Sequence, residues 1–177
     1  MDVWWWIGSV LLALFIGVMV SRAMQRRAFA RAFPYHMAEA LFTPAERAFL
    51  SVLDKAVGPR YRVFGKVRIA DIAAVSETFT SSVRQVAFNK ISAKHVDFVV
   101  CRASDLKMVC AVELNDKSHD TERAQQRDKF VATVFEVIDL PLLMVPARRR
   151  YSQRELRREF MAAVGDSDPS ANVSPRE

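Results

Sequence analysis

Cysteine is scarce in this chain, and its scarcity excludes one class of metal site. Only two of the 177 residues are cysteines, Cys101 and Cys110, and no Cys-x-x-Cys pair occurs. A zinc ribbon is therefore not supported. Both cysteines lie in apolar segments, so we interpret them as small buried hydrophobic residues. In a reducing cytosol they would not form a disulfide, even as neighbours.

Charge is missing from the first part of the chain. Residues 4–20 include no charged side chain, and only two glycines and one serine interrupt the apolar run. A helix over residues 3–20 would span roughly 27 Å, close to the hydrocarbon core of a bilayer. We predict a transmembrane anchor over residues 3–24. The alternative is a buried core helix, but such helices seldom run this long without a polar face.

Acidic residues are absent from residues 3–38, whereas Arg22, Arg26 and Arg27 follow the apolar run. Arg31 continues this basic stretch. By the positive-inside rule, the C-terminal side of the anchor faces the cytoplasm. A cleavable signal peptide would carry its positive charges before the apolar run instead. We therefore expect an uncleaved single-pass protein of a bacterial-type inner (cytoplasmic) membrane, with its C-terminal domain in the cytoplasm and a basic juxtamembrane linker over residues 25–40.

The rest of the chain has the pattern of an α/β domain over residues 41–164. Thr43-Pro44-Ala45-Glu46 is a capping box that begins a helix, and Gly58 ends it. Strands are predicted at 61–69, 95–101, 107–114 and 142–145, and further helices at 83–91, 121–138 and 152–164. This order predicts a small mixed sheet flanked by helices on both faces. Residues 165–177 are expected to be a disordered tail.

Two predicted strands each carry a carboxylate. If residues 95–101 and 107–114 pair as a hairpin around Ser104 and Asp105, then Cys101 lies near Cys110 and Asp97 lies opposite Glu113. Opposite residues of an antiparallel pair have Cβ atoms roughly 5 Å apart. Two carboxylates this close repel each other unless a cation lies between them or one keeps its proton. A divalent cation such as Mg²⁺ (or Mn²⁺) is the common solution.

Three linked motifs resemble a known family. Val96-Asp97-Phe98-Val99, the segment from Ala111 to His119, and Arg127-Asp128-Lys129-Phe130 are similar to the domain of unknown function 2726 family. The same order of elements resembles the PD-(D/E)XK (restriction-endonuclease-like) nuclease superfamily and, more distantly, the very-short-patch repair endonucleases.

The resemblance implies a metal-dependent nuclease fold in which Asp97 and Glu113 hold the metal, joined by Glu46 from the first helix. The superfamily usually has a lysine where this chain has Asn115, and a neutral amide cannot supply an ammonium charge. Neighbouring residues could replace that lysine. The candidates are Lys94, Lys117, His119 and Lys129, of which His119 could also be a metal ligand or general base.

Each candidate also has a structural interpretation. Asp97 and Glu113 could serve as hydrogen-bond acceptors only, Glu46 is explained by the capping box, and Asn115 could merely form a turn. Arg127 could contact a phosphate or pair with Asp128. Arg148, Arg149 and Arg150 could contact a nucleic-acid backbone, anionic lipid headgroups or solvent, and His95 shares a face with Asp97 by strand alternation.

Three functions therefore remain open from the sequence. The first is a membrane-tethered, metal-dependent nuclease acting on DNA or RNA. The second is a catalytically inactive module that keeps the nuclease fold and binds nucleic acid or a protein at the inner membrane. The third is a membrane-proximal scaffold whose carboxylates are purely structural. The net charge of +6 is compatible with nucleic acid or anionic lipid but does not distinguish them.

Overall fold

The computed structural model describes residues 3–33, 35–115 and 122–165, and the chain divides into one unit up to Leu41 and a second from Phe42. The first unit contains α1 (Val3–Ala32). Within it, Trp4–Arg27 is long and apolar enough to cross a membrane, and none of its most apolar stretch is buried. The predicted N-terminal apolar helix is therefore confirmed. Its length and composition fit a membrane anchor and also fit a signal sequence.

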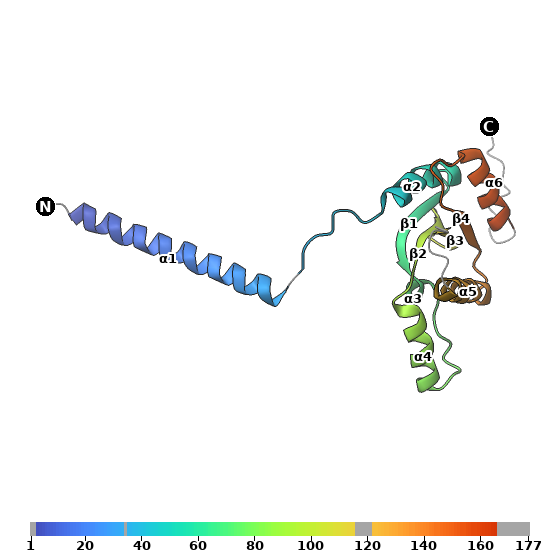
Figure 1. Ribbon diagram of the computed structural model, residues 1–177, viewed down its shortest axis with the longest axis horizontal. Helices are drawn as coiled ribbons and strands as arrows, with labels where there is room; N and C mark the ends of the chain where they lie inside the picture. Colours follow the sequence, from blue (N-terminus) through green and yellow to red (C-terminus); the bar gives the residue numbers. More distant parts are fainter. Residues whose placement is uncertain (1–2, 34, 116–121, 166–177) are drawn as a thin grey trace. The chain divides into compact units, whose positions relative to one another are not determined.

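The second unit is built on a four-stranded mixed sheet, drawn in Figure 1. Its strands are β1 (Tyr61–Arg68), β2 (His95–Arg102), β3 (Met108–Asn115) and β4 (Leu142–Pro146), in that spatial order. The pairs β1–β2 and β2–β3 are antiparallel, whereas β4 is parallel to β3. A parallel neighbour requires a crossover connection, and α5 (Glu122–Val137) provides it.

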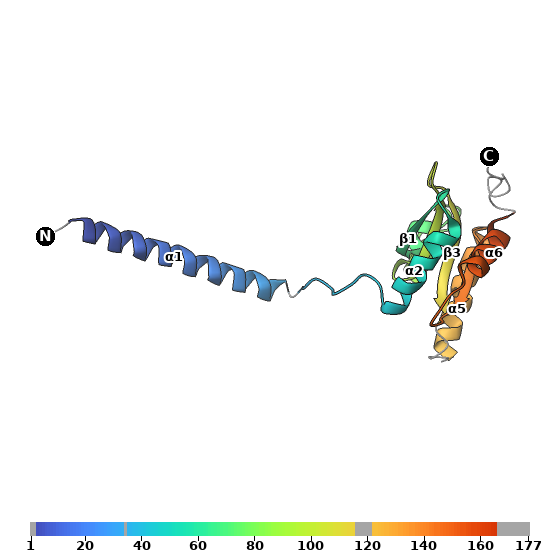
Figure 2. The ribbon, with the colours of Figure 1, turned by 90° about the horizontal axis from the view of Figure 1, so that it is seen from above.

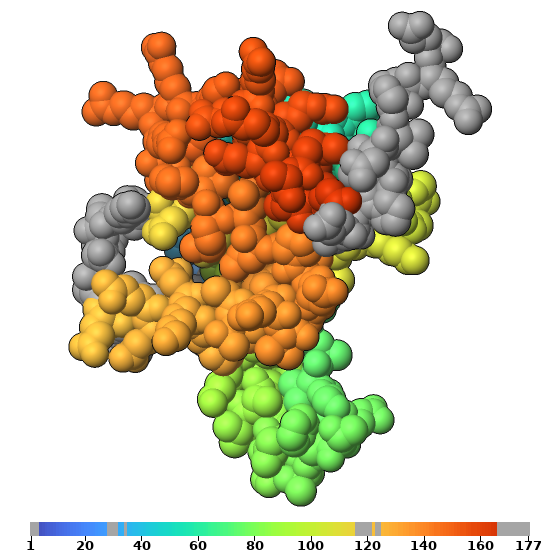
Figure 3. Space-filling view, turned by 90° about the vertical axis from the view of Figure 1, so that its right-hand side faces the viewer, coloured from blue at the N-terminus to red at the C-terminus, as the bar shows by residue number. Residues whose placement is uncertain are grey.

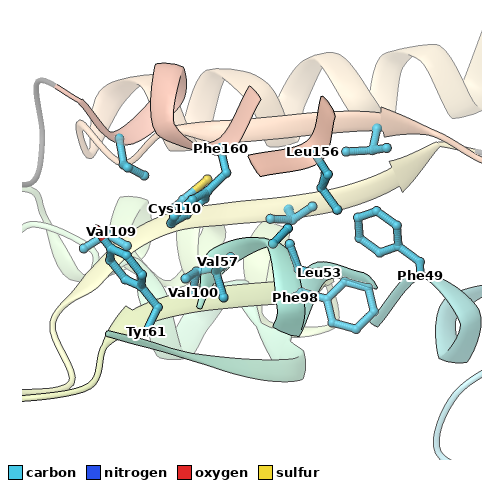
Figure 4. Packing of buried hydrophobic residues seen from close by; sticks show 14 residues of the cluster. Phe49, Leu53, Val57, Tyr61, Phe98, Val100, Val109, Cys110, Leu156 and Phe160 are labelled. Atoms are coloured by element: carbon cyan, nitrogen blue, oxygen red, sulfur yellow. The ribbon is translucent and has the colours of Figure 1, made fainter. Parts of the chain in front are cut away.

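Helices cover both faces of this sheet, as Figure 2 shows from a second direction. On one face, α2 (Pro44–Val57) and α6 (Gln153–Val164) pack over the strands, with Phe49, Leu53, Leu156 and Phe160 in the core between them (Figure 4). On the other face, α3 (Ile69–Ile72) and α5 enclose a second core that includes Ile69, Val131 and Phe135. The predicted mixed sheet with flanking helices is confirmed.

Local sequence signals explain where the helices begin. Thr43 Oγ1 accepts a hydrogen bond from the Glu46 backbone N–H, and the Thr43 N–H donates to Glu46 Oε2, which completes the predicted capping box. Gly58 ends α2 in a left-handed conformation with φ of 81°, which glycine adopts without strain. Ser152 caps α6 through the Glu155 N–H.

Helix α4 (Ser81–Ser92) begins two residues before the predicted helix and projects beyond α5, as the space-filling view shows (Figure 3). A pocket of about 580 Å³ lies between α4, α5 and residues 73–75. Apart from Lys90, its lining carries no charged residue. It therefore contains none of the predicted carboxylates.

The two cysteines do not face each other across the hairpin, in contrast to the sequence-based expectation that Cys101 lies near Cys110. An irregularity between Val100 and Cys101 shifts the register, so Cys101 pairs with Met108 and Val100 pairs with Cys110. The two thiols consequently belong to different cores, Cys110 beneath α2 and α6 and Cys101 on the α5 side. Both cysteines are free and buried.

Candidate functional site

The candidate site lies where β2 and β3 stop pairing through their backbones. The ladder runs from Val100 to Phe98 opposite Val112. One residue further on, side chains replace it: the Asp97 N–H donates to Glu113 Oε2 at 3.2 Å, and the Leu114 N–H donates to Asp97 Oδ2 at 3.0 Å. The two carboxylates thus lie together, each fixed by a backbone N–H of the opposite strand.

Both β1 and β2 are distorted beside this point. In β2, Val96 packs in the α5-side core whereas Phe98 packs in the core beneath α2. A regular strand would place both on one face, because side chains alternate with a period of two. The same change of face occurs in β1, where Gly65 lies against Phe42 but Val67 packs on the α5 side. The residues between them are Asp97 and Lys66.

Lys66 makes the central contacts of the site. Its backbone has a φ of 55° inside a strand, a left-handed conformation that costs an L-residue roughly 1–2 kcal/mol. The register passes from the pair Gly65–Phe98 to the pair Val67–Val96 and omits Lys66. From this position Lys66 Nζ lies 2.6 Å from Glu46 Oε1 and 3.2 Å from Asp97 Oδ1.

The three carboxylates share one arrangement. In each carboxylate, one oxygen accepts a hydrogen bond from a backbone N–H and the other oxygen faces a cationic side chain. Glu46 uses Oε2 for Thr43 and Oε1 for Lys66, and Asp97 uses Oδ2 for Leu114 and Oδ1 for Lys66. Glu113 Oε1 faces Arg127 at the longer distance of 3.8 Å. One oxygen of each group is therefore oriented toward positive charge.

The site is largely removed from solvent. Asp97 is 9% exposed, and no other polar or charged residue in the described parts of the chain is buried. Burial raises the pKa of Glu113 to about 7, and the negative charge of Asp97 adds to the rise. For Glu46, burial by itself would raise the pKa, but the hydrogen bonds from Lys66 and Thr43 outweigh it and lower the pKa. Burial opposes the charge of Lys66, yet its hydrogen bond to Glu46 and the charge of Asp97 raise its pKa.

The donor set suits a hard divalent cation, although the side chains are not arranged around one. Within the described residues, no group of three or more His, Cys, Asp and Glu side chains is positioned to hold a metal ion. The Lys66 ammonium lies between Glu46 and Asp97 and contacts both carboxylates. Carboxylate oxygens are the ligands that Mg²⁺ prefers, and a positive charge already stands between two of them.

The other predicted residues have contacts or exposure of their own, or lie outside the described chain. Asn115 ends β3, where its backbone pairs with β4 and its C=O accepts from the Ala147 N–H. Lys117 and His119 fall in 116–121, outside the described residues. Lys94 Nζ donates to the Lys90 C=O and lies over the Phe130 ring. His95 and Lys129 are exposed.

The predicted nucleic-acid contacts are solvent-facing. Arg127 pairs with Asp128 at 3.3 Å, as its structural interpretation expects, and its side chain is 61% exposed. The Arg148 backbone N–H donates to the Tyr151 hydroxyl, and its guanidinium lies 3.9 Å from Glu155. Arg149 and Arg150 are exposed. Any contact of these arginines with a nucleic-acid backbone would be made at the protein surface.

Lys66 is the residue that the sequence did not single out. Strict alternation along 61–69 would place it with Arg62 and Phe64, on the side away from Tyr61 and Val63. The left-handed backbone at Lys66 breaks that alternation and places the ammonium on the α2 side instead. The one available signal was Gly65, because a glycine inside a strand often marks a bulge or a close approach.

Comparison with known proteins identifies the family. The model of the family described as "Protein of unknown function (DUF2726)" matches residues 38–164, so this chain belongs to that family. The match covers all the strands and helices from α2 to α6. Neither the curated proteins nor the solved structures gave a match.

Proposed function

We propose that this DUF2726 protein is a divalent-metal-dependent nuclease of the PD-(D/E)XK type, held at a membrane by α1. The observation that carries the proposal is the carboxylate arrangement: Glu46, Asp97 and Glu113 come from α2, β2 and β3, and each presents one oxygen to a cation. The order of a helix, three antiparallel strands, a crossover helix and a parallel fourth strand supports the same assignment.

Asp97 and Glu113 would hold Mg²⁺ or Mn²⁺, with Glu46 as a third ligand. When bound, the ion would activate a water molecule and neutralise charge on the scissile phosphate. The protein fixes these three ligands before any metal binds. In each carboxylate, the oxygen that does not face a cation accepts a hydrogen bond from a backbone N–H: Asp97 donates to Glu113, Leu114 to Asp97 and Thr43 to Glu46. Such preorganisation lowers the cost of assembling the site.

The test is cleavage of plasmid DNA, single-stranded DNA and RNA by the full chain in detergent, with Mg²⁺ or Mn²⁺. We expect cleavage that a chelator stops. Asp97→Asn and Glu113→Gln should lower it by about 100-fold or more, whereas Asp71→Asn, which changes an exposed carboxylate of α3, should not. Equal cleavage by wild type and both site variants would refute the proposal.

A second candidate rests on Asn115, a neutral residue where the resemblance expects a lysine. In this version the domain binds nucleic acid without cutting it. It predicts binding that weakens steeply with salt and no turnover with any metal. Cleavage that is lost in Asp97→Asn would exclude it.

The location of the domain is part of the first proposal. Four arginines, at positions 22, 26, 27 and 31, follow the uncharged run of residues 4–20, so we infer an uncleaved anchor with the domain in the cytoplasm. A C-terminal green fluorescent protein fusion should fluoresce and sediment with membranes at its full mass. Cleavage of this fusion would refute the topology. So would a second C-terminal fusion, to alkaline phosphatase, that shows the enzyme's periplasmic activity.

A further inference from the structure

The site already contains one cation, and that cation belongs to the chain. Lys66 Nζ bridges Glu46 Oε1 and Asp97 Oδ1 at 2.6 and 3.2 Å. In both carboxylates the other oxygen accepts a hydrogen bond from a backbone N–H, of Thr43 for Glu46 and of Leu114 for Asp97. A divalent cation held by both carboxylates would have to compete with this ammonium for the same oxygens.

The chain is distorted to put the ammonium there. Lys66 has a left-handed backbone within β1, and it is left out of the register opposite Asp97, which is also unpaired. The neighbouring Gly65 allows the Phe42 ring to lie where any Cβ would stand. An ordinary surface lysine needs none of these features. Strain of this kind clusters at functional sites.

Lys66 also differs from the other nearby positive charge. Arg127 lies 3.8 Å from Glu113, pairs with Asp128 and is 61% exposed. The Lys66 side chain is 23% exposed and contacts two carboxylates that are each 12% exposed. Its four-carbon stem is flexible, so the ammonium can move toward solvent without a change in the fold.

We propose that Lys66 is the exchangeable cation of this site. Before metal binds, the Lys66 ammonium neutralises Glu46 and Asp97. When a divalent ion takes its place, the ammonium turns outward and contacts the substrate phosphate. It then supplies the positive charge that Asn115 lacks. The proposal rests on the proposed nuclease function in its second half only. Its first half concerns metal affinity and stands without any cleavage.

The first experiment measures metal affinity in the full chain in detergent. Mn²⁺ is titrated by calorimetry into wild type, Lys66→Met and the control Lys107→Met, which removes an exposed lysine near the β2–β3 turn. Because the ammonium competes with the metal, Lys66→Met should bind Mn²⁺ about tenfold or more tightly than wild type, and Lys107→Met should not differ. Unchanged or weaker binding by Lys66→Met would overturn the proposal.

The second experiment measures cleavage at saturating Mn²⁺. Lys66→Met should lose cleavage by about 100-fold or more although it binds the metal better, and Lys66→Arg should recover part of it. Full cleavage by Lys66→Met would overturn the catalytic half. If wild type cleaves nothing while Lys66→Met still binds Mn²⁺ more tightly, the nuclease proposal fails and the exchange of cations stands.

A folding control keeps the two experiments interpretable. Without metal, Lys66→Met leaves two carboxylates uncompensated whose side chains are each only 12% exposed. Its melting temperature should therefore fall, and Mn²⁺ should raise it more than it raises that of wild type. If Lys66→Met does not fold, Lys66→Gln replaces it, because the amide can still donate to a carboxylate while carrying no charge. An equal rise in melting temperature with Mn²⁺ in wild type and variant would contradict the exchange.

Discussion

Glu113 should make the metal-free domain less stable as pH rises through neutrality. Burial and the charge of Asp97 raise its pKa from an ordinary 4.5 to about 7. Between these values the folded state holds a proton that the unfolded state has released. The free energy of unfolding therefore falls with increasing pH across this window and levels off above about pH 7.

The size of the effect follows from the shift. About 2.5 pKa units at 1.36 kcal/mol each give a loss of about 3 kcal/mol between pH 4.5 and pH 8, and the Glu113 side chain is only 17% exposed. The shifted pKa values of Glu46 and Lys66 do not change this pH dependence. The lowered pKa of Glu46 stabilises the fold at all pH values above 4.5, and the raised pKa of Lys66 stabilises it at all values below 10.5.

Urea denaturation at pH 5 and pH 8 would measure this slope in a fragment from residue 38 onward. That fragment contains both hydrophobic cores and the whole family match. All three tryptophans lie at positions 4–6, so circular dichroism is the suitable signal. Wild type should lose about 2.5 kcal/mol more than Glu113→Gln between the two pH values, and Glu113→Gln should be the more stable at pH 8.

The control is Glu136→Gln, which changes an exposed glutamate of α5 and should leave the pH dependence as in wild type. Parallel curves for wild type and Glu113→Gln would refute the reasoning, because they would show that Glu113 titrates at the same pH in both states. Mn²⁺ should in addition bind more tightly at pH 8 than at pH 6, since a metal ligand must be ionised.

Two further predictions concern the fold. Thr43→Ala should lower the stability of the domain by about 1 kcal/mol because it removes a capping hydrogen bond. Thr80→Ala should have little effect, because the Thr80 side chain makes no cap hydrogen bond to α4. Thermal melts compare the two variants, and equal losses of stability would contradict the capping argument. Burial raises the pKa of the Cys110 thiol to about 12 and also raises that of Cys101, so iodoacetamide at pH 8 should label neither thiol until urea unfolds the domain; labelling of the native protein, detected by mass spectrometry, would contradict this.

Much of the fold could be predicted because its signals are local. The capping box at Thr43 and the serine cap of α6 each specify a helix start through a side chain and a nearby N–H. The apolar run of β2 and the long helix after β3 specify the hairpin and its crossover. The position of Asp97 beside Glu113 followed from counting residues back from the hairpin turn.

Register and face were harder to predict, because each depends on a single irregular residue. The shift between Val100 and Cys101 sends the two cysteines into different cores. The left-handed Lys66 moves its side chain to the face opposite the one that alternation assigns. Neither irregularity has a local sequence signature as strong as a helix cap, so strand alternation predicts an ideal strand and assigns Lys66 to the wrong face.

The same irregularities argue that the carboxylates do more than join two strands. A regular ladder past Phe98 and Val112 would satisfy the backbone without burying charge. This chain instead ends the ladder, adopts a left-handed residue in β1 and places Glu113, with its side chain only 17% exposed, beside Asp97. There, ionisation of Glu113 costs about 3 kcal/mol at pH 8. Buried ion pairs add little net stability compared with apolar packing. Unfavourable features gathered around Lys66, Asp97 and Glu113 are therefore expected of a site that binds a cation, because the ligand that relieves the repulsion also stabilises the fold.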